Sequence, residues 1–244
     1  MPIERRTGGV FGQLIEAFWQ LPAKGGTGES LLEILPDTHF ALGFGISERN
    51  CRILAGGPST KAVRLSVTDA RDFFFVRFRP GRLPRLLGLQ PPDLVDQTEL
   101  GLQSVLGHSA DVWGERLREV RTLEGRQAIL EEAFLSARPD LLCQDRRCLQ
   151  AITLVEAVDG RIQVTELARD LGLSPRTLER LFREQIGLTP KRFIRQVRFQ
   201  TALRLLKDRR GTSLGRIAQV CGYADQTHFI NEFKELAGRL PSKF

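Results

Sequence analysis

The spacing of hydrophobic residues divides the chain into parts of different character. Between residues 31 and 78, β-branched and aromatic residues form short runs that are interrupted by Pro-Asp, Gly-Gly-Pro and Pro-Gly, a pattern typical of strands joined by tight turns. The sequence therefore predicts a β-rich first part. The expected strands are Leu31–Leu35, His39–Ile46, Arg52–Ala55, Ala62–Val67 and Phe73–Phe78.

The spacing becomes helical in the middle of the chain. Apolar residues recur every three or four positions from Trp113 to Leu123, and a second helical stretch from Ile129 to Phe134 ends before Pro139. From Cys148 to the end, helical spacing alternates with tight turns. We therefore predict an α+β protein with a β-rich, barrel-like domain and trailing helices over residues 1–138, a linker over 139–149, and an all-α domain over 150–244.

The excess of basic residues is confined to the last part of the chain. The whole sequence of 244 residues has a net charge of +7, yet residues 1–149 hold 19 basic and 19 acidic residues. Residues 150–244 hold 17 basic and 10 acidic residues, so they carry the entire excess. A confined positive excess is expected of a domain that binds a polyanion, and it makes nucleic acid a candidate partner.

The composition disfavours several other classes of protein. No run of about 18 apolar residues is present, so we expect no membrane span, and the amino terminus lacks the apolar stretch of a signal peptide. Four scattered cysteines without a CxxC pair support neither a disulfide scaffold nor a zinc site. No catalytic triad, phosphate-binding loop or paired acidic motif is recognisable. We therefore expect a cytoplasmic protein that is not an enzyme and needs no cofactor.

The last part contains an internal repeat. Glu166–Gly172 aligns with Arg216–Gly222 at an offset of 50 residues, and after one additional residue the offset is 51. Two copies of one supersecondary unit are therefore predicted. At the second offset Leu178 aligns with Phe229, Phe182 with Phe233, Gly187 with Gly238 and Pro190 with Pro241.

Each copy has the features of a helix-turn-helix. Gly172 and Gly222 lie where the first helix ends, a position at which a left-handed backbone favours glycine. Ser174 followed by Pro175 predicts the N-cap and first residue of a second helix, and Asp225 is the corresponding cap in the second copy. Apolar residues four apart in each second helix are expected to face inward, which leaves polar residues outside.

The outward-facing polar residues of the two second helices are suited to contact bases. Arginine can bond guanine in a bidentate way, glutamine or asparagine can do so with adenine, and hydroxyl groups can contact either base. The alternative is that these residues are the solvated faces of amphipathic helices, but two matched copies in the basic half favour DNA. The residues predicted to contact bases are Arg176, Thr177, Glu179 and Arg180 in the first copy and Gln226, Thr227, His228 and Asn231 in the second.

A long helix is predicted between the copies, from Pro190 to Lys207, because no further proline and no glycine interrupts this stretch. At about 1.5 Å per residue it spans about 27 Å, so it could hold two second helices roughly one DNA turn, about 34 Å, apart. Its outer basic residues are expected either to contact phosphates or to keep the helix soluble. The predicted phosphate contacts are Lys191, Arg192, Arg195 and Arg198 on this helix and Arg183 before it.

These motifs resemble the DNA-binding domain of the AraC/XylS family of bacterial transcription regulators. The resemblance implies seven helices that form two helix-turn-helix units joined by a long helix. It also implies a sequence-specific regulator that binds double-stranded promoter DNA and contacts RNA polymerase, as an activator or a repressor. The resemblance covers residues 150–244 and is carried by Leu167–Ala168, Leu173–Phe182, Gly187–Pro190, Ile217–Ala218, Gly222–Phe229, Phe233–Lys234 and Pro241–Ser242.

The amino part resembles the β-rich regulatory domain of one branch of this family. Such a domain implies a small-molecule effector or the pairing of subunits into a homodimer, often on a cupin-like barrel. An architectural DNA-binding protein without an effector is the alternative that this part leaves open. The resemblance is carried by Trp19, Leu35–Asp37, Val76–Gly81 and Leu86–Gly88.

Three features of the sequence allow more than one interpretation. His39 is the one histidine among the expected strands, which favours a structural role over metal binding. The phenylalanines between 73 and 78 either line a pocket or fill the interior, and strand alternation favours filling. Cys143 and Cys148 flank the expected domain boundary and are either a redox switch or ordinary unpaired cysteines.

A DNA-repair enzyme that carries the same DNA-binding domain is an alternative function. Such an enzyme would need a zinc-held cysteine cluster and a Pro-Cys-His motif, and neither occurs in the sequence.

Overall fold

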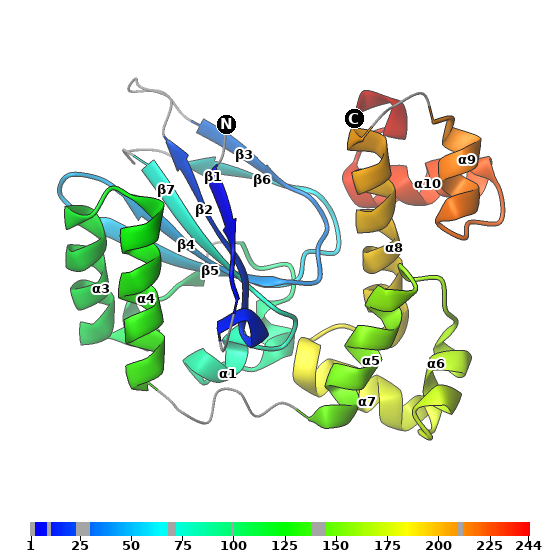
Figure 1. Ribbon diagram of the computed structural model, residues 1–244, viewed down its shortest axis with the longest axis horizontal. Coiled ribbons are helices and arrows are strands. Elements are labelled where there is room, and N and C mark those ends of the chain that lie inside the picture. The colour runs from blue at the N-terminus through cyan, green and yellow to red at the C-terminus, as the bar shows by residue number, and fades with distance from the viewer. Residues whose placement is uncertain are drawn as a thin grey trace. The chain divides into compact units, whose positions relative to one another are not determined.

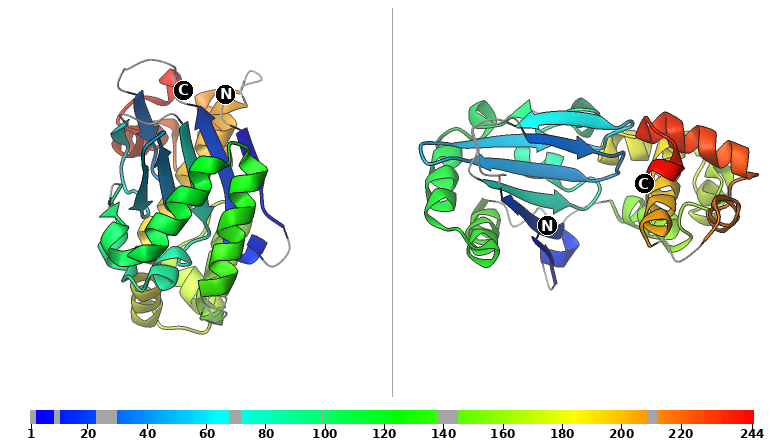
Figure 2. Two further views of the ribbon diagram at one scale, coloured as in Figure 1. Left: turned by 90° about the vertical axis from the view of Figure 1, so that its left-hand side faces the viewer. Right: turned by 90° about the horizontal axis from the view of Figure 1, so that it is seen from above.

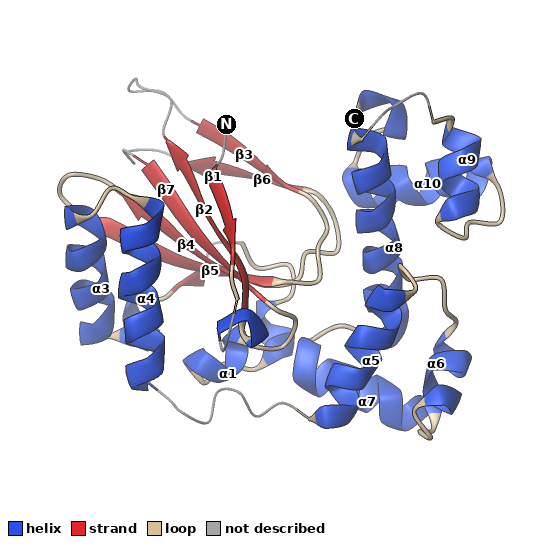
Figure 3. Ribbon diagram, viewed as in Figure 1, coloured by secondary structure: helices blue, strands red, loops and turns tan. Residues whose placement is uncertain are grey.

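Two compact units make up the chain in a computed structural model that describes residues 3–8, 11–22, 30–67, 72–98, 100–137, 145–208 and 212–244. The second unit comprises Asp145–Phe244 together with two short segments of the first half, Glu33–Thr38 and Pro58–Val63. Strands dominate the first unit and helices the second, as Figure 3 shows. The predicted α+β class, with the β-rich part first, is confirmed.

The first unit is built on two sheets. All pairings in the larger sheet are antiparallel, and the five predicted strands match observed strands to within one residue at every end. The larger sheet has the order β1 (Ile3–Arg6), β2 (Ile15–Pro22), β7 (Asp72–Phe78), β4 (Phe40–Ile46), β5 (Cys51–Gly56) and β8 (Leu100–Gly101), and the smaller sheet pairs β3 (Ser30–Ile34) with β6 (Val63–Val67).

Two helices cover one face of the larger sheet. α3 (His108–Glu119) contacts β5 and α4 (Leu123–Ala137) contacts β2, and the pair lies side by side in Figures 1 and 2. The ring of Phe134 meets Phe78 edge-on at a centroid distance of 5.6 Å and Trp113 at 5.7 Å. The core of this unit therefore lies between the sheet and these helices. Four short helical segments complete the described part of the unit: Phe11–Gln13, α1 (Leu83–Leu87), Pro91–Leu94 and α2 (Gln103–Leu106).

The phenylalanines of β7 fill both faces of the sheet. Phe74 and Phe78 are fully buried on the core side, whereas Phe75 stacks on Trp19 with ring centroids 4.8 Å apart. The interpretation that these rings fill the interior therefore holds for Phe74 and Phe78. His39 has a structural role as well, because its Nε2 lies 3.0 Å from Glu16 Oε2 and its Nδ1 lies 3.2 Å from a guanidinium nitrogen of Arg77.

The apolar spacing from Trp113 to Leu123 spans two helices, although the sequence predicted one continuous pattern. The chain is extended at Val120, with φ −104° and ψ 131°, and α4 begins three residues later. The break is stabilised by Arg126, whose Nε donates to the Val120 carbonyl at 2.8 Å. The same guanidinium forms a buried ion pair with Asp72, at 3.0 Å and 3.1 Å.

The second unit contains six α-helices and a final 3-10 turn, Pro241–Lys243, among the residues described. Figure 1 shows the central helix with one helix pair at each of its ends. The predicted repeat is confirmed, because the first helix of each pair has 7 residues and the second has 12. The helices are α5 (Arg146–Ala157), α6 (Val164–Asp170), α7 (Pro175–Ile186), α8 (Pro190–Lys207), α9 (Leu214–Val220) and α10 (Gln226–Ala237).

The central helix α8 contributes to the core at both of its ends. Phe193 meets Phe182 of α7 at a centroid distance of 5.5 Å, and Phe199 meets Phe233 of α10 at 4.9 Å. All four rings are fully buried. The predicted bounds of α8 are observed, and one helix thus anchors both helix pairs.

The beginning of the second unit lies within the predicted linker. α5 starts at Arg146, and Asp145 caps it by accepting a hydrogen bond from the backbone N–H of Arg147 at 2.9 Å. Residues 138–144, which include Cys143 and Pro139, lie outside the described part of the chain. The domain boundaries at 138 and 150 therefore stay predictions.

The two segments from the first half are bonded to the helices of the second unit. Gln196 of α8 donates to the carbonyl of Ser59 at 2.9 Å, and the N–H of Ala62 donates to the carbonyl of Leu236 at 2.8 Å. Gln196 is almost completely buried, so its amide needs this partner. Arg239 pairs with Glu33 at 2.7 Å. None of the described helices has the length and apolar character needed to cross a membrane.

Candidate nucleic-acid interface

The second helix of each pair begins at a capping residue. Ser174 Oγ accepts a hydrogen bond from the N–H of Thr177 at 3.1 Å, and Pro175 occupies the first helical position. Asp225 Oδ1 accepts from the N–H of His228 at 2.7 Å at the start of α10. Both predicted caps are confirmed, and each satisfies one backbone donor that the helix itself leaves unpaired.

Glycine allows the tight turn within each helix pair. Gly172 and Gly222 have φ angles of +63° and +73°, in the left-handed region that other residues rarely adopt. Gly187 and Gly238 end the second helices in the same conformation, with φ of +85° and +71°. The repeat therefore fixes the two turns and the two helix ends in matching backbone conformations.

The residues predicted to contact bases on α7 are accessible. Arg176, Glu179 and Arg180 are exposed and Thr177 is partly exposed, whereas Leu178 between them is fully buried. Two of these side chains have partners one turn later: Glu179 with Arg183 at 3.0 Å, and Arg180 with Glu184 at 3.5 Å. Such exposed pairs contribute about 0–1 kcal/mol, so DNA can replace them at little cost.

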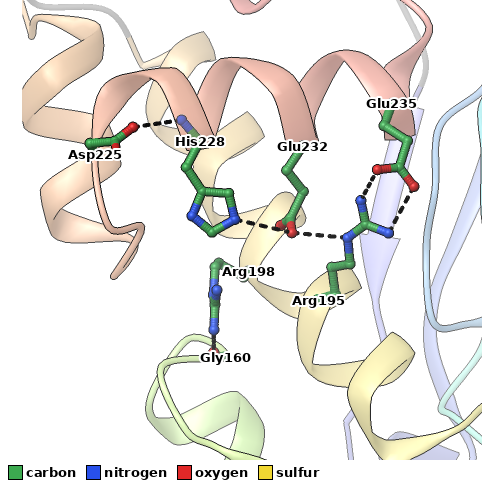
Figure 4. Close-up of polar contacts among 7 residues, drawn as sticks. All are labelled: Gly160, Arg195, Arg198, Asp225, His228, Glu232 and Glu235. Atoms are coloured by element: carbon green, nitrogen blue, oxygen red, sulfur yellow. Dashed lines mark hydrogen bonds and ion pairs between the residues drawn. The ribbon is translucent and has the colours of Figure 1, made fainter.

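The residues predicted to contact bases on α10 are exposed as well, and one of them, His228, contacts two other side chains. The ring of His228 meets Tyr223 edge-on at 5.5 Å, and its Nε2 lies 4.0 Å from Glu232 Oε2. Figure 4 shows this imidazole turned along the helix toward Glu232. Gln226, Thr227 and Asn231 complete the exposed set on α10.

The five predicted phosphate contacts fall into two groups. Lys191 and Arg192 are exposed on the first turn of α8, and Arg183 is exposed on α7, as a phosphate contact requires. Arg195 and Arg198 are partly buried and already hold partners within the second unit. Both guanidinium groups are bonded to protein groups and remain partly exposed, so their predicted contact with phosphate stays a prediction.

Arg195 is held by two carboxylates of α10. Its Nε lies 2.9 Å from Glu232 Oε2, and its two Nη atoms bond the carboxylate of Glu235 at 3.0 Å and 2.5 Å. The guanidinium lowers the pKa of Glu235, and the same hydrogen bonds raise the pKa of Arg195. Glu235 therefore keeps its charge to a lower pH than a glutamate without such a partner.

Sequence reasoning missed the acidic partners of these arginines. Glu232 and Glu235 are three residues apart on α10, which places both on one helix face, and this spacing was visible in the sequence. Nothing local indicates that Arg195, some forty residues earlier, crosses this face. That contact depends on how α8 and α10 pack.

The cysteines of the described residues are buried or partly buried. Burial raises the pKa of Cys51 to about 12 and that of Cys221 to about 11. Cys148 is fully buried on α5, and its predicted redox partner Cys143 lies outside the described residues. Within the described residues, no group of three or more His, Cys, Asp or Glu side chains is arranged to hold a metal ion.

Two family descriptions match this chain. Residues 167–244 match a helix-turn-helix domain, and residues 11–99 match a domain of unknown function. The first match begins within α6 and runs through α7, α8, α9 and α10. The second match covers the strands from β2 to β7. The two matches therefore fall on different parts of the chain, the first on helices and the second mainly on strands.

Several regulators are similar to parts of this chain. The uncharacterized HTH-type transcriptional regulator YidL of Escherichia coli (strain K12) is 28% identical over 168 residues, which cover 62% of this chain and 56% of that protein. The HTH-type transcriptional activator RhaS of Klebsiella pneumoniae (strain 342) is 41% identical over 69 residues, which cover 28% of this chain and 24% of that protein.

Solved structures are similar to part of this chain. A transcriptional regulator of Chromobacterium violaceum, described among AraC-type DNA-binding domain-containing proteins, is 26% identical, covers 40% of this chain and 88% of that chain, and has a TM-score of 0.37. Across the curated relatives, the matched region spans between 24% and 56% of the relative's length.

Proposed function

Because the carboxy-terminal domain of this chain belongs to the AraC/XylS family of helix-turn-helix regulators, we propose that the protein is a sequence-specific DNA-binding regulator of transcription. Its two second helices, α7 and α10, act as recognition helices that enter successive major grooves of promoter DNA. The proposed function is binding rather than catalysis, and it places the protein in the bacterial cytoplasm, where promoter DNA is found.

One observation carries this proposal. Two helix-turn-helix units with matching caps, turns and lengths are attached to one helix, and each presents an exposed polar face while its Phe and Leu side chains are buried. A single amphipathic helix with polar residues would be ordinary. Two copies in the part of the chain that carries the entire charge excess fit a duplex with two neighbouring grooves.

We assign the contacts to DNA by exposure and chemistry. Phosphate contacts hold the protein in register and base contacts supply the sequence preference. The residues proposed to contact phosphates are Arg183, Lys191 and Arg192. The residues proposed to contact bases are Arg176, Thr177, Glu179, Arg180, Gln226, Thr227, His228 and Asn231.

The first unit is proposed to control this binding. The resemblance of the amino part to a regulatory domain supports an effector of low molecular weight, the pairing of two subunits, or both. Contact with RNA polymerase and activation of transcription are proposed on the same ground, since one similar relative is named a transcriptional activator.

Selection of binding sites from random duplexes tests the proposal directly. The purified full-length protein is mixed with a random pool, and bound duplexes are enriched and sequenced at physiological salt. We expect one motif with two conserved blocks about one helical turn apart, bound about a thousandfold or more tighter than random DNA. Enrichment without a motif, at an affinity equal to that for random DNA, would contradict the proposal. Genome-wide footprinting then shows whether the sites lie in promoters.

A further inference from the structure

Arg195 joins α8 to the second recognition helix. All three of its guanidinium nitrogens bond carboxylates of α10, and the Glu232 side chain is only 12% exposed. Figure 4 shows the guanidinium between Glu232 and Glu235 on one side of α10. Because the two carboxylates lie about one turn apart on that helix, the contact restrains both its rotation and its tilt against α8.

Arg198, three residues later on α8, contacts the turn between α5 and α6 and the turn between α9 and α10. Its Nε and Nη2 donate to the carbonyl of Gly160 at 3.2 Å and 2.9 Å, in the turn before α6. Its Cζ lies 5.4 Å from the centroid of the Tyr223 ring, in the turn before α10. One side chain therefore joins the turn between α5 and α6, just before the first helix-turn-helix, to the turn of the second helix-turn-helix.

A third set of bonds attaches the turn between α5 and α6 to α8. Asp159 accepts a hydrogen bond from Thr201 Oγ1 at 2.9 Å and pairs with Arg204 at 3.1 Å. Together with the bonds of Arg198, these contacts leave the turn before α6 little freedom to move along α8. Side chains of α8 therefore bond both the segment that precedes the first helix-turn-helix and α10 of the second.

We propose that Arg195 and Arg198 are positioning residues that fix the separation and relative rotation of the two recognition helices. They thereby determine how many base pairs must lie between the two half-sites for the protein to bind both. A half-site here is the block of bases that one recognition helix contacts. The inference rests on the proposed function. Adding one base pair moves a half-site about 3.4 Å along the duplex and turns it by roughly 34°. Two recognition helices that are rigidly joined therefore lose contacts with bases when the spacing changes.

Spacing selectivity distinguishes this role from phosphate binding. A phosphate contact contributes to every duplex alike, whatever the spacing, and it appears in the salt dependence of binding. A positioning contact changes the ratio between affinities for the natural spacing and for spacings altered by one base pair. That ratio is the quantity to measure.

The experiment uses the full-length protein and the site obtained by selection. Duplexes with the natural spacing, and with one base pair inserted or deleted between half-sites, are titrated with the wild type, Arg195→Met and Arg198→Met. Arg192→Met is the matched control, because Arg192 is an exposed arginine on the same helix, proposed to contact phosphate. Glu235→Gln removes the charge of an exposed carboxylate that bonds Arg195, and it alters no buried group. This variant replaces Arg195→Met in the experiment if Arg195→Met folds poorly. Circular dichroism and thermal unfolding confirm that each variant is folded.

We expect the wild type to lose about tenfold or more in affinity when the spacing changes by one base pair, the equivalent of about one lost base contact. In the Arg195 and Arg198 variants this ratio should fall to about threefold or less, whereas Arg192→Met should lower affinity at all spacings and keep the ratio. A wild-type ratio near one, or an unchanged ratio in the Arg195, Arg198 and Glu235 variants, would overturn the inference and leave the proposed function intact. Absence of a selected motif would instead count against the proposed function.

Discussion

Gly160 lies so close to the backbone of α8 that a Cβ at this position would be 2.7 Å from the carbonyl oxygen of Ile194. Its φ is +73°, and that of Gly172 is +63°, yet a Cβ on Gly172 would have no heavy atom within 4 Å. The two glycines therefore share a backbone conformation and differ in their surroundings. Close approach to α8 makes Gly160 part of the contact between the α5–α6 turn and the central helix.

Alanine at these two glycines should separate backbone strain from steric contact. Gly172→Ala is expected to lower the free energy of unfolding by about 1–2 kcal/mol, the cost of a left-handed conformation. Gly160→Ala should lower it by a further 1–3 kcal/mol or so, because the helix must also move away. Urea unfolding followed by far-ultraviolet circular dichroism measures both. Equal losses in the two variants would show that Gly160 is not in close contact with α8.

The buried ion pair of Arg126 and Asp72 should dominate the electrostatic stability of the first unit. Arg126 is fully buried, so Arg126→Met leaves the carboxylate of Asp72 without its cation and is expected to cost about 3–5 kcal/mol. The control is Arg116→Met, which removes an exposed pair with Glu132 and should cost about 1 kcal/mol or less. Both tryptophans, Trp19 and Trp113, belong to this unit, so tryptophan fluorescence during urea unfolding reports its stability. Similar losses in the two variants would contradict the prediction.

Local signals in the sequence were sufficient for much of the fold. The caps Ser174 and Asp225, the turn glycines and Pro190 act through their own backbone, so their effects can be recognised without knowing distant contacts. β2 was missed for an equally local reason. A register shift between Ile15 and Ala17 interrupts the alternation, so that Ala17 and Phe18 are both buried.

The candidate site was predictable in its composition but not in its internal contacts. Exposure of the polar residues on α7 and α10 follows from helical periodicity, because the buried Leu and Phe residues fix which face is outward. The roles expected of Arg195 and Arg198 rested on charge alone. Charge identifies a cation, whereas its partner depends on which helices cross, and α8 meets α10 only in the folded chain.

The buried thiols should make stability fall at alkaline pH. The pKa of Cys51 is raised to about 12 and that of Cys221 to about 11, against about 8.5 in an unfolded chain. Between about pH 9 and 11 the unfolded chain therefore binds fewer protons than the native protein, and the free energy of unfolding decreases as pH rises, by up to about 1.4 kcal/mol per pH unit for each thiol. Comparing urea midpoints of the wild type with those of Cys221→Ala at rising pH isolates one thiol. A slope identical to that of the wild type would contradict the raised pKa of Cys221.

Base and phosphate contacts should respond differently to DNA sequence and to salt. Arg180→Ala and Asn231→Ala are expected to weaken binding to the selected site by about 1–3 kcal/mol and to relax the preference in one half-site each, because they remove donors to base edges. Arg192→Ala should weaken binding to selected and random duplexes alike and reduce the slope of log affinity against log salt by about one, because it removes one phosphate contact. Fluorescence anisotropy titrations over a range of salt concentrations measure both quantities. If all three variants lost the same affinity on both kinds of duplex, the recognition helices would be binding the DNA backbone rather than its bases.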